Sequence, residues 1–434
     1  MLKGTRKIKD NLNTIIKQMS ENTVKFARNP EIDFTRKRKL SFSETLKVLL
    51  TMGGNSLSCE LLKYFDYDEN APTSSAFIQQ RSKINDFAMP FLFHQFTNTA
   101  KNLKTHKGYR LLATDGTFLN ISVNLNDSDS YYRSKSSEKG YNQLHLSVFY
   151  DLCNKIYADV QILPRRKADE RRALVDMLGK SNYSIKTIII ADRGYESYNV
   201  FANIEQKGYK YAIRVKDMTR TSILSTLPLP ETSEFDVSVS LNLTRSQAKE
   251  VKYNCEYKYL PSCVNFDFLE PKESGIYRIS FRVVRFEVSA GKYESIITNL
   301  DKSEFSAVDI KKIYQMRWGI ETSFRELKYS IGLVNLHAKK RNFIRQEIFA
   351  RLIMYNFCSM VIAQIVIKQK STKHYYQANF TMAVQVCKLF LRGKAPPGKV
   401  ETLIQKHILP IRENRANARN ISAKTFVSFT YRVA

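Results

Sequence analysis

The sequence predicts an α/β fold in which helices cover a central sheet, preceded by a helical region and interrupted by a mostly β segment. Three patterns support this prediction. Residues 1–105 carry helix-like apolar spacing with capping signals at the helix starts. From residue 109, apolar strands alternate with helices, which is typical of α/β sheets. Residues 217–295 then show short alternating stretches, such as YRISFRVVRFEVS, that predict antiparallel strands.

The composition indicates a folded protein with a polyanionic partner. The chain has 434 residues, of which 43% are hydrophobic, enough for a large core and more than one domain. Lys and Arg number 69 against 41 Asp and Glu, which gives a net charge of +28. A globular protein with this excess binds a polyanion more often than not. Because no basic amphipathic segment suited to a membrane surface is found, nucleic acid is the expected partner.

Several other classes of protein do not fit the sequence. The basic start lacks the apolar core of a signal peptide, and the apolar run at residues 352–367 is too short and too polar to span a membrane. None of the six cysteines forms a CxxC pair, which disfavours structural zinc and fits a reducing cytoplasm. The chain has no Walker-type loop and no GxGxxG turn, so no small-molecule cofactor is expected.

Two interpretations of the N-terminal region stay open. Its short helices are joined by tight turns in a basic chain, which favours a DNA reader similar to a helix-turn-helix. A plain helical bundle fits the same pattern equally well. In the first interpretation, four polar residues of one helix would face DNA: Gln79, Gln80, Arg81 and Lys83.

Two apolar strands of the core region each end in an aspartate beside a glycine. YRLLATDGT ends near Asp115, KTIIIADRGY ends near Asp192, and a hairpin at residues 144–163 is expected between them. In open α/β sheets, functional groups gather at the C-terminal ends of strands. A lone aspartate there is more often a turn former or a helix cap, so neither residue identifies a site by itself.

A helix is expected at residues 313–333, with the sequence IYQMRWGIETSFRELKYSIGL. At about 100° per residue, its large apolar residues form one stripe, and four polar residues fall within an adjacent arc of roughly 60°. A solvated charged edge on an ordinary amphipathic helix would show the same pattern. The four polar residues are Tyr314, Arg317, Glu321 and Lys328.

The two strand-end aspartates and the helix glutamate together suggest metal chemistry. If Asp115, Asp192 and Glu321 lie close together, they repel one another unless they share cations. Carboxylate oxygens select Mg²⁺, with Mn²⁺ as a substitute. Two such ions can activate water or a DNA 3′-hydroxyl and stabilise the leaving oxygen of a displacement at phosphorus. The cationic edge of the helix can then hold the neighbouring phosphates.

The spacing within this helix resembles a known family signature. Tyr314-x2-Arg317-x3-Glu321-x6-Lys328 resembles the YREK signature of bacterial insertion-sequence transposases of the DDE class, in the insertion-sequence family numbered four. ATDGT, IADRGY, PTSSAFIQQRSKI and LHAKKRNFIRQEIFARLIMYNF resemble the same family, so the resemblance extends over most of the chain.

This resemblance implies an RNase H-like catalytic core. Asp115, Asp192 and Glu321 would form the catalytic triad and hold two Mg²⁺ or Mn²⁺ ions. In some relatives, a tryptophan of the β insertion receives a flipped base, but the only tryptophan here lies inside the signature helix. A Phe or Tyr of the insertion would have to replace it. The residues expected to contact DNA are Tyr314, Arg317 and Lys328, with Arg193 and Trp318 as further candidates.

The resemblance and the patterns together predict five parts. Residues 1–105 would form an N-terminal helical DNA-binding domain. Residues 106–216 and 296–370 would form the two parts of the RNase H-like core, and the second part would contain the YREK helix. Residues 217–295 would form a β insertion, and residues 371–434 would form a helical C-terminal region with a basic tail.

The expected function is DNA transposition. By the resemblance, the protein would bind the terminal inverted repeats of its element as a homodimer on paired ends. It would cut both ends through DNA hairpins and join them to double-stranded target DNA, in the bacterial cytoplasm and at the nucleoid. Two alternatives stay open: a DDE nuclease without strand transfer, and a non-catalytic DNA-binding protein derived from a transposase.

Overall fold

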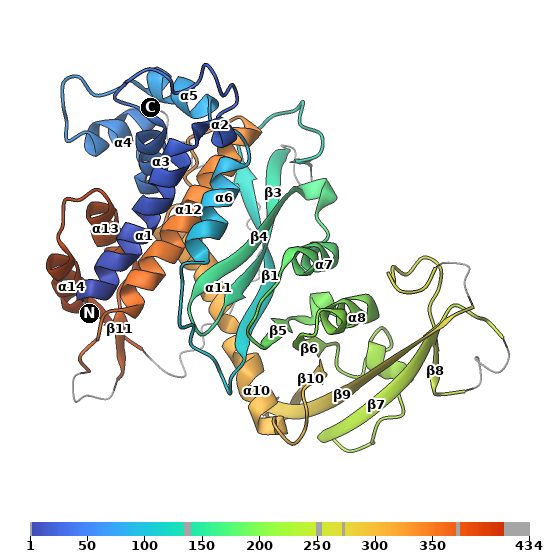
Figure 1. The fold of residues 1–434 in the computed structure, drawn as a ribbon. Helices are drawn as coiled ribbons and strands as arrows, with labels where there is room; N and C mark the ends of the chain where they lie inside the picture. Colours follow the sequence, from blue (N-terminus) through green and yellow to red (C-terminus); the bar gives the residue numbers. More distant parts are fainter. Residues whose placement is uncertain (1, 134–139, 249–253, 271–273, 370–373, 412–434) are drawn as a thin grey trace.

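The computed structural model describes residues 2–133, 140–248, 254–270, 274–369 and 374–411 (Figure 1). It shows a central mixed sheet with helices on both faces and a long β extension at one end (Figure 1). Among these residues we find no helix with the length and apolar character needed to cross a membrane. The predicted α/β class is confirmed, whereas its RNase H-like subtype stays a prediction.

The regular elements before residue 105 are helices, as expected. Three of them, α1, α3 and α6, pack against the long helix α12 (Arg341–Ala363), which is buried over most of its length. Ser41, Ser56 and Thr73 each begin a helix by accepting a hydrogen bond from a backbone N–H of its first turn. The helices are α1 (Leu2–Glu21), α2 (Thr23–Phe26), α3 (Phe42–Thr51), α4 (Leu57–Tyr64), α5 (Ser74–Ser82) and α6 (Ala88–Thr97).

Helix α5 packs on α12 through residues that were expected to face DNA. Arg81 is 1% exposed and donates hydrogen bonds to Glu347 at 2.7 Å and to the Phe343 carbonyl at 2.8 Å. Gln80 is also buried. The prediction that these two residues face DNA is therefore wrong, because a partner on a distant helix satisfies the guanidinium. Only Gln79, which is exposed, and Lys83, which is half-buried, keep access to solvent.

Strand β1 (Arg110–Ile121) lies inside the sheet, between β3 (Tyr141–Asp151) and β5 (Thr187–Ala191). It runs antiparallel to β3 and parallel to β5, and β5 is parallel to β6 (Lys210–Val215). β4 (Ile156–Pro164) pairs with β3 and forms the predicted hairpin with it. The predicted order of strand, hairpin, helix, strand, helix and strand is confirmed. The short strand β2 (Tyr131–Tyr132) also pairs with β3.

The sheet separates two hydrophobic cores. Successive residues of a strand point to opposite faces. Leu111 accordingly packs in the core that includes α12, whereas Leu112 packs in the core that includes helices α7 (Glu170–Lys180) and α8 (Tyr198–Gln206). Figure 1 shows α12 on one side of the sheet and α7 and α8 on the other. The short helices η1 (Arg165–Lys167), η2 (Arg193–Tyr195) and η3 (Ile223–Thr226) lie in the connections.

The β segment expected at residues 217–295 continues the same sheet. β10 (Lys292–Thr298) pairs antiparallel with β6 of the core, and β9 (Ile276–Ser289) then pairs with β10. β7 (Phe235–Thr244) and β8 (Tyr257–Tyr259) complete the edge and form the extension that projects from the body (Figure 1). The strands are present as expected, and the domain boundaries stay a prediction.

The helix expected at residues 313–333 is not one regular helix. Ser306 and Asp309 form a capping box that begins α10 (Ala307–Met316). The α-helix is interrupted at Arg317. It continues as α11 (Trp318–Arg325), which is followed by a π-helical turn, η4 (Glu326–Ser330). A uniform 100° wheel therefore does not describe this stretch. π-Helical turns are rare in proteins, and those that do occur are often found at functional sites.

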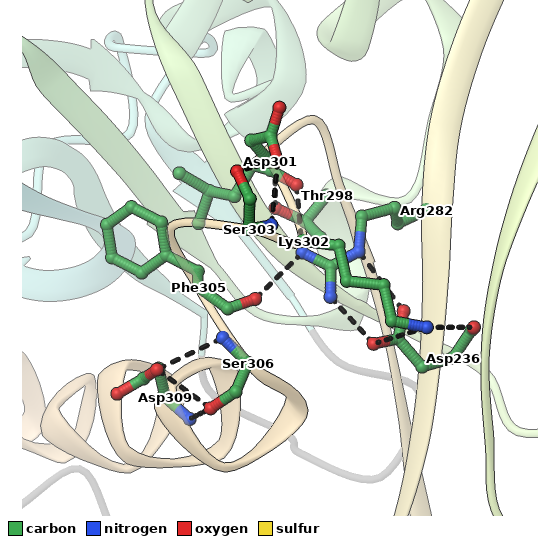
Figure 2. Close-up of polar contacts among 10 residues, drawn as sticks. Asp236, Arg282, Thr298, Asp301, Lys302, Ser303, Phe305, Ser306 and Asp309 are labelled. Atoms are coloured by element: carbon green, nitrogen blue, oxygen red, sulfur yellow. Dashed lines mark hydrogen bonds and ion pairs between the residues drawn. The ribbon is translucent and has the colours of Figure 1, made fainter.

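A buried arginine ties the β extension to the start of α10 (Figure 2). Arg282 of β9 donates to both carboxylate oxygens of Asp236 on β7, at 3.1 and 2.7 Å. Its remaining terminal nitrogen donates to the carbonyls of Leu300 and Phe305, at 2.9 and 3.0 Å. Lys302 lies 3.7 Å from the same carboxylate. Because the 300–305 segment leads directly into α10, these contacts anchor the segment that precedes that helix.

Replacing Arg282 with methionine is expected to lower the free energy of unfolding by about 2 kcal/mol, because it leaves two buried carbonyls and part of the Asp236 carboxylate without their donor. Urea unfolding followed by circular dichroism measures this change. Arg278→Met, at an exposed position of the same strand, is the matched control and should change stability by less than about 0.5 kcal/mol. Equal effects of the two substitutions would contradict the role given to Arg282.

The C-terminal region is largely helical. α13 (Phe380–Leu391) and α14 (Pro397–Lys406) pack beside each other, and β11 (Tyr376–Ala378) pairs with β12 (Ile408–Pro410). The basic tail expected at the end of the chain falls on residues 412–434, which lie outside the described residues.

Candidate active site

Asp115 and Asp192 lie side by side because their strands are parallel. In the ladder between β1 and β5, Ala113 pairs with Ile190. Each aspartate follows two residues later on its own chain, beyond the point where this ladder ends. Both aspartates therefore lie beyond the C-terminal end of this parallel pair, where α/β folds place functional groups. The sequence prediction that the first strand ends at Asp115 is wrong, because β1 continues to Ile121 and Asp115 pairs with Val148 of β3.

The surroundings of Asp115 disfavour its ionised form. Burial raises the pKa of this carboxyl to about 6, and the nearby charges of Asp192 and Glu170 act in the same direction. The Gly116 N–H, which donates to Asp115 at 2.8 Å, and the guanidinium of Arg317 oppose this rise in the pKa. A carboxylate held among other carboxylates in this way is typical of a site that binds a cation.

Asp192 begins a tight turn. Its side chain accepts a hydrogen bond at 2.8 Å from the Gly194 N–H and so caps the short helix η2. This is the capping role that a lone aspartate commonly has. The capping bond uses one carboxylate oxygen, Oδ1, and Asp192 still lies near enough to raise the pKa of Asp115.

Arg317 joins the third carboxylate to the first. It lies at the break between α10 and α11, and it is 6% exposed. Its Nη2 is 2.9 Å from Glu321 Oε1, and its Nη1 is 3.9 Å from Asp115 Oδ2. The structure thus brings Asp115, Asp192, Arg317 and Glu321 into one cluster.

The other residues expected to contact DNA have different surroundings. The Tyr314 hydroxyl is buried, so it can reach DNA only if its side chain moves. Trp318 is 52% exposed, and its ring lies 5.5 Å from the Arg317 guanidinium carbon. Lys328 is half-buried in the π-helical turn, and burial lowers the pKa of its ammonium group. Arg193 is exposed in the turn after Asp192. Their DNA contacts stay predictions.

Sequence reasoning missed two residues of this cluster, Glu170 and His145. Glu170, the first residue of α7, lies close enough to raise the pKa of Asp115. His145 of β3 is 1% exposed, and its Nε2 is 3.0 Å from Glu170 Oε1. An acidic residue in the first turn of a helix is common in any protein, so the sequence carried no specific signal for this pair.

The residue types in this cluster suit a hard divalent cation, but the distances between their side chains do not. Asp115, Asp192 and Glu321 supply carboxylate oxygens, the donors that Mg²⁺ and Mn²⁺ prefer. Within the described ranges, however, no three Asp, Glu, His or Cys side chains lie close enough together to hold a metal ion. Arg317 is bound to Glu321 and approaches Asp115. A cation shared by the triad would therefore require Arg317 to release Glu321.

Comparison with known proteins identifies a matching family. The family model described as the transposase DDE domain matches residues 106–357. The transposase for insertion sequence element IS421 of Escherichia coli is 36% identical over 73 residues, 17% of this chain and 20% of that protein. InsL of insertion sequence element IS186A, from Escherichia coli strain K12, matches to the same extent. The chain therefore aligns with about one fifth of the length of these relatives.

A piggyBac transposase, solved as a synaptic complex with hairpin DNA, is 11% identical to this chain with a TM-score of 0.46. That comparison covers 91% of this chain and 78% of the other. At these values we draw no conclusion from it. The match to the transposase DDE domain spans more than half of the 434 residues and contains Asp115, Asp192 and Glu321, and the protein belongs to that family.

Proposed function

We propose that this protein is an insertion-sequence transposase of family four, with Asp115, Asp192 and Glu321 as its catalytic triad. It binds the terminal inverted repeats of its element and catalyses DNA strand cleavage and strand transfer. The observation that carries the proposal is the cluster in which Arg317 joins Glu321 to Asp115 beside Asp192. In this proposal the core is RNase H-like, and residues 1–105 form the DNA-binding domain.

The triad would hold two Mg²⁺ or Mn²⁺ ions, which supply an activated attacking oxygen and a stabilised leaving oxygen when bound. Arg317 binds Glu321 until a cation and a scissile phosphate enter, and it then turns its guanidinium to the phosphate. This exchange keeps its charge paired in both states, which matters because Arg317 is buried. The buried Tyr314 hydroxyl follows the same movement and donates to a phosphate oxygen.

Lys328, Arg193 and Trp318 extend the proposed contact surface along the DNA. Lys328 and Arg193 bind backbone phosphates, and the exposed Trp318 ring packs against a sugar or base. The net charge of +28 supports double-stranded DNA as the partner, both as transposon end and as target. We propose a homodimer on paired ends, hairpin intermediates and a cytoplasmic location at the nucleoid.

The test is an excision assay on a plasmid that carries the DNA flanking this gene on both sides. The wild-type protein is expected to cut at the element ends only with Mg²⁺ or Mn²⁺ present. Glu321→Gln should lose activity on the order of 1,000-fold or more while it still shifts the same DNA in a gel. Glu69→Gln, at an exposed position far from the triad in sequence, is the matched control and should cut normally.

The same assay separates the alternatives. Precut ends that join to target DNA support transposition, whereas ends that are cut but never joined indicate a nuclease without strand transfer. Equal excision by the wild type and by Glu321→Gln would overturn the catalytic assignment. It would leave a DNA-binding protein derived from a transposase.

A further inference from the structure

A cationic group lies beside the second half of strand β1, outside the candidate active site. Arg165, the first residue of η1, lies between the rings of Phe118 and Tyr132. We propose that this arginine binds a backbone phosphate of the DNA, a few nucleotides from the bond that is cut. This inference rests on the proposed function, because it extends the path of the DNA away from the same site.

Two aromatic rings hold the guanidinium of Arg165 in a fixed plane. Its central carbon lies 3.9 Å from the centre of the Tyr132 ring and 4.8 Å from the centre of the Phe118 ring. One of its terminal nitrogens also donates a hydrogen bond to Gln143 Oε1. A stacked arginine keeps the planar fork of N–H groups that matches a phosphate, and it loses less side-chain freedom on binding. Arg165 is therefore preorganised to bind an anion.

The charge of Arg165 lacks a carboxylate partner within the described part of the chain. The side chain is half-buried, and its contacts there are the two uncharged rings and the neutral amide of Gln143. By contrast, Arg214 is also half-buried and pairs with Glu294 at 2.7 Å. A charge that is partly removed from water is stabilised by an opposite charge. The remaining N–H groups of Arg165 therefore suit an anionic partner from outside the chain.

The surroundings of Arg165 are basic and favour a polyanion over a small acidic group. Arg166 and Lys167 follow it directly in η1, and both are exposed. Lys167 pairs with Asp129 at 2.8 Å, so one of these three charges is already offset. Consecutive cations beside aromatic rings are typical of a surface that follows a nucleic-acid backbone. The partner expected at Arg165 is therefore DNA, in agreement with the proposed function.

The stacked arginine lies close enough to the triad to contact the same DNA strand. Phe118 follows Asp115 by three residues on β1, about 10 Å along a strand, which corresponds to about three phosphates of one DNA strand. The two side chains point to opposite faces of the sheet. Among the described residues, however, β5 pairs with β1 only from Arg110 to Ala113, so the second half of β1 has a free edge. A DNA strand that crosses this edge can contact both Asp115 and Arg165.

The test measures DNA affinity at several salt concentrations in EDTA, so that no strand is cut. The probes are a duplex of the DNA flanking this gene and an unrelated duplex of equal length. Arg165→Met keeps a side chain between the rings but removes the charge. It is expected to weaken binding to both duplexes by about 10-fold. It should also reduce the slope of log affinity against log salt by about 1, because one phosphate contact is lost.

Arg172→Met is the matched control, because it removes the same charge from an arginine that already pairs with Asp176 at 2.9 Å. It should leave both the affinity and the slope unchanged. Phe118→Leu keeps the charge of Arg165 but removes one of the rings that position it. This variant should weaken binding by a smaller factor than Arg165→Met and should leave the slope unchanged.

A second measurement locates the contact on the DNA. Single phosphates within about four nucleotides of the cut are replaced, one at a time, with uncharged methylphosphonates. At one position the wild type should lose about 10-fold in affinity, and Arg165→Met should lose nothing further, because the contact is already absent. A purely structural Arg165 would not be coupled to one particular phosphate.

Thermal denaturation shows whether each variant is folded. A folded Arg165→Met protein with the affinity and salt slope of the wild type would overturn the inference. Equal sensitivity of both proteins to every methylphosphonate would overturn it as well. The salt measurement needs no catalysis, so the two proposals can fail separately. If the wild type never cuts the flanking DNA but Arg165→Met still lowers the affinity and the slope, the proposed function fails and the phosphate contact stands.

Discussion

Asp115→Asn is expected to abolish strand cleavage and, at the same time, to stabilise the metal-free protein. The loss of activity should be on the order of 1,000-fold or more, because the amide cannot replace an anionic metal ligand. The gain in stability has a separate cause. In the folded protein, burial raises the pKa of Asp115 to about 6, with Asp192 and Glu170 adding to the rise. The ionised carboxylate is therefore less favourable in the folded state than in the unfolded chain.

The sign of the pH dependence follows from this shift in the pKa. An ordinary aspartate has a pKa of 3.8, so between about pH 4 and pH 6 the folded state holds a proton that the unfolded state has lost. Stability contributed by this group is complete at low pH and is lost as the pH rises through 6. At pH 7.5 the asparagine variant should be more stable by about 1–3 kcal/mol, and the difference should vanish near pH 4.

Thermal denaturation of both proteins in EDTA, at pH 7.5 and pH 4, measures this prediction. Adding Mg²⁺ should raise the melting temperature of the wild type more than that of the variant, because a bound cation offsets the crowded negative charge. Such opposite effects on activity and stability are expected where a site is built for function. A variant that is inactive and also less stable at pH 7.5 would show that Asp115 has a structural role instead.

The two candidate aspartates were predictable from sequence, but their proximity was not, and neither was the end of the first strand, which lies at Ile121 and not at Asp115. Apolar runs ending at Asp115 and Asp192 are local patterns that a reader can see in the chain. That β1 and β5 are parallel neighbours, with Ala113 opposite Ile190, is a long-range property that only the folded sheet shows. The position of Glu170 near Asp115 is likewise a long-range property, because the β3–β4 hairpin lies between β1 and α7 in the chain.

The signature helix shows a second limit of sequence reasoning. The spacing of its polar residues assumes 3.6 residues per turn throughout. The actual stretch is interrupted at Arg317 and then widens into a π-helical turn that contains Lys328. The wheel nevertheless grouped Arg317 with Glu321 correctly, because the structure pairs these two side chains at 2.9 Å. It could not show that Tyr314 is buried.

Arg81 shows a third limit of sequence reasoning, because its burial was not predicted. Replacing it is expected to have the second large effect. Arg81→Met is expected to lower the free energy of unfolding by about 3–5 kcal/mol, because it leaves the carboxylate of Glu347 buried without its main cationic partner. The two side chains are 2% and 1% exposed, and their atoms lie 2.7 Å apart. The His337 N–H also donates to Glu347 at 2.8 Å. Burial alone would raise the pKa of Glu347, but these partners hold it at about 2.

Urea unfolding at pH 7 measures this loss, and Lys83→Met at the end of the same helix is the matched control. The control should change stability by less than about 0.5 kcal/mol. If instead Arg81 faced DNA, as its sequence context suggested, Arg81→Met would weaken DNA binding and leave unfolding unchanged. The structure predicts instead that Arg81→Met lowers the free energy of unfolding and leaves the DNA affinity of the folded protein unchanged.

The double variant Arg81→Met with Glu347→Met gives the sharper result. Removing one partner leaves a buried charge without its counter-charge, whereas removing both replaces an ion pair with apolar side chains of similar length. The double variant should therefore be more stable than either single variant, with a coupling energy of about 2 kcal/mol or more. The gain should be incomplete, because Gln346 also bonds to Arg81, at 3.1 Å, and loses this donor in both Arg81 variants. Strictly additive losses would show that the two residues stabilise α5 and α12 independently.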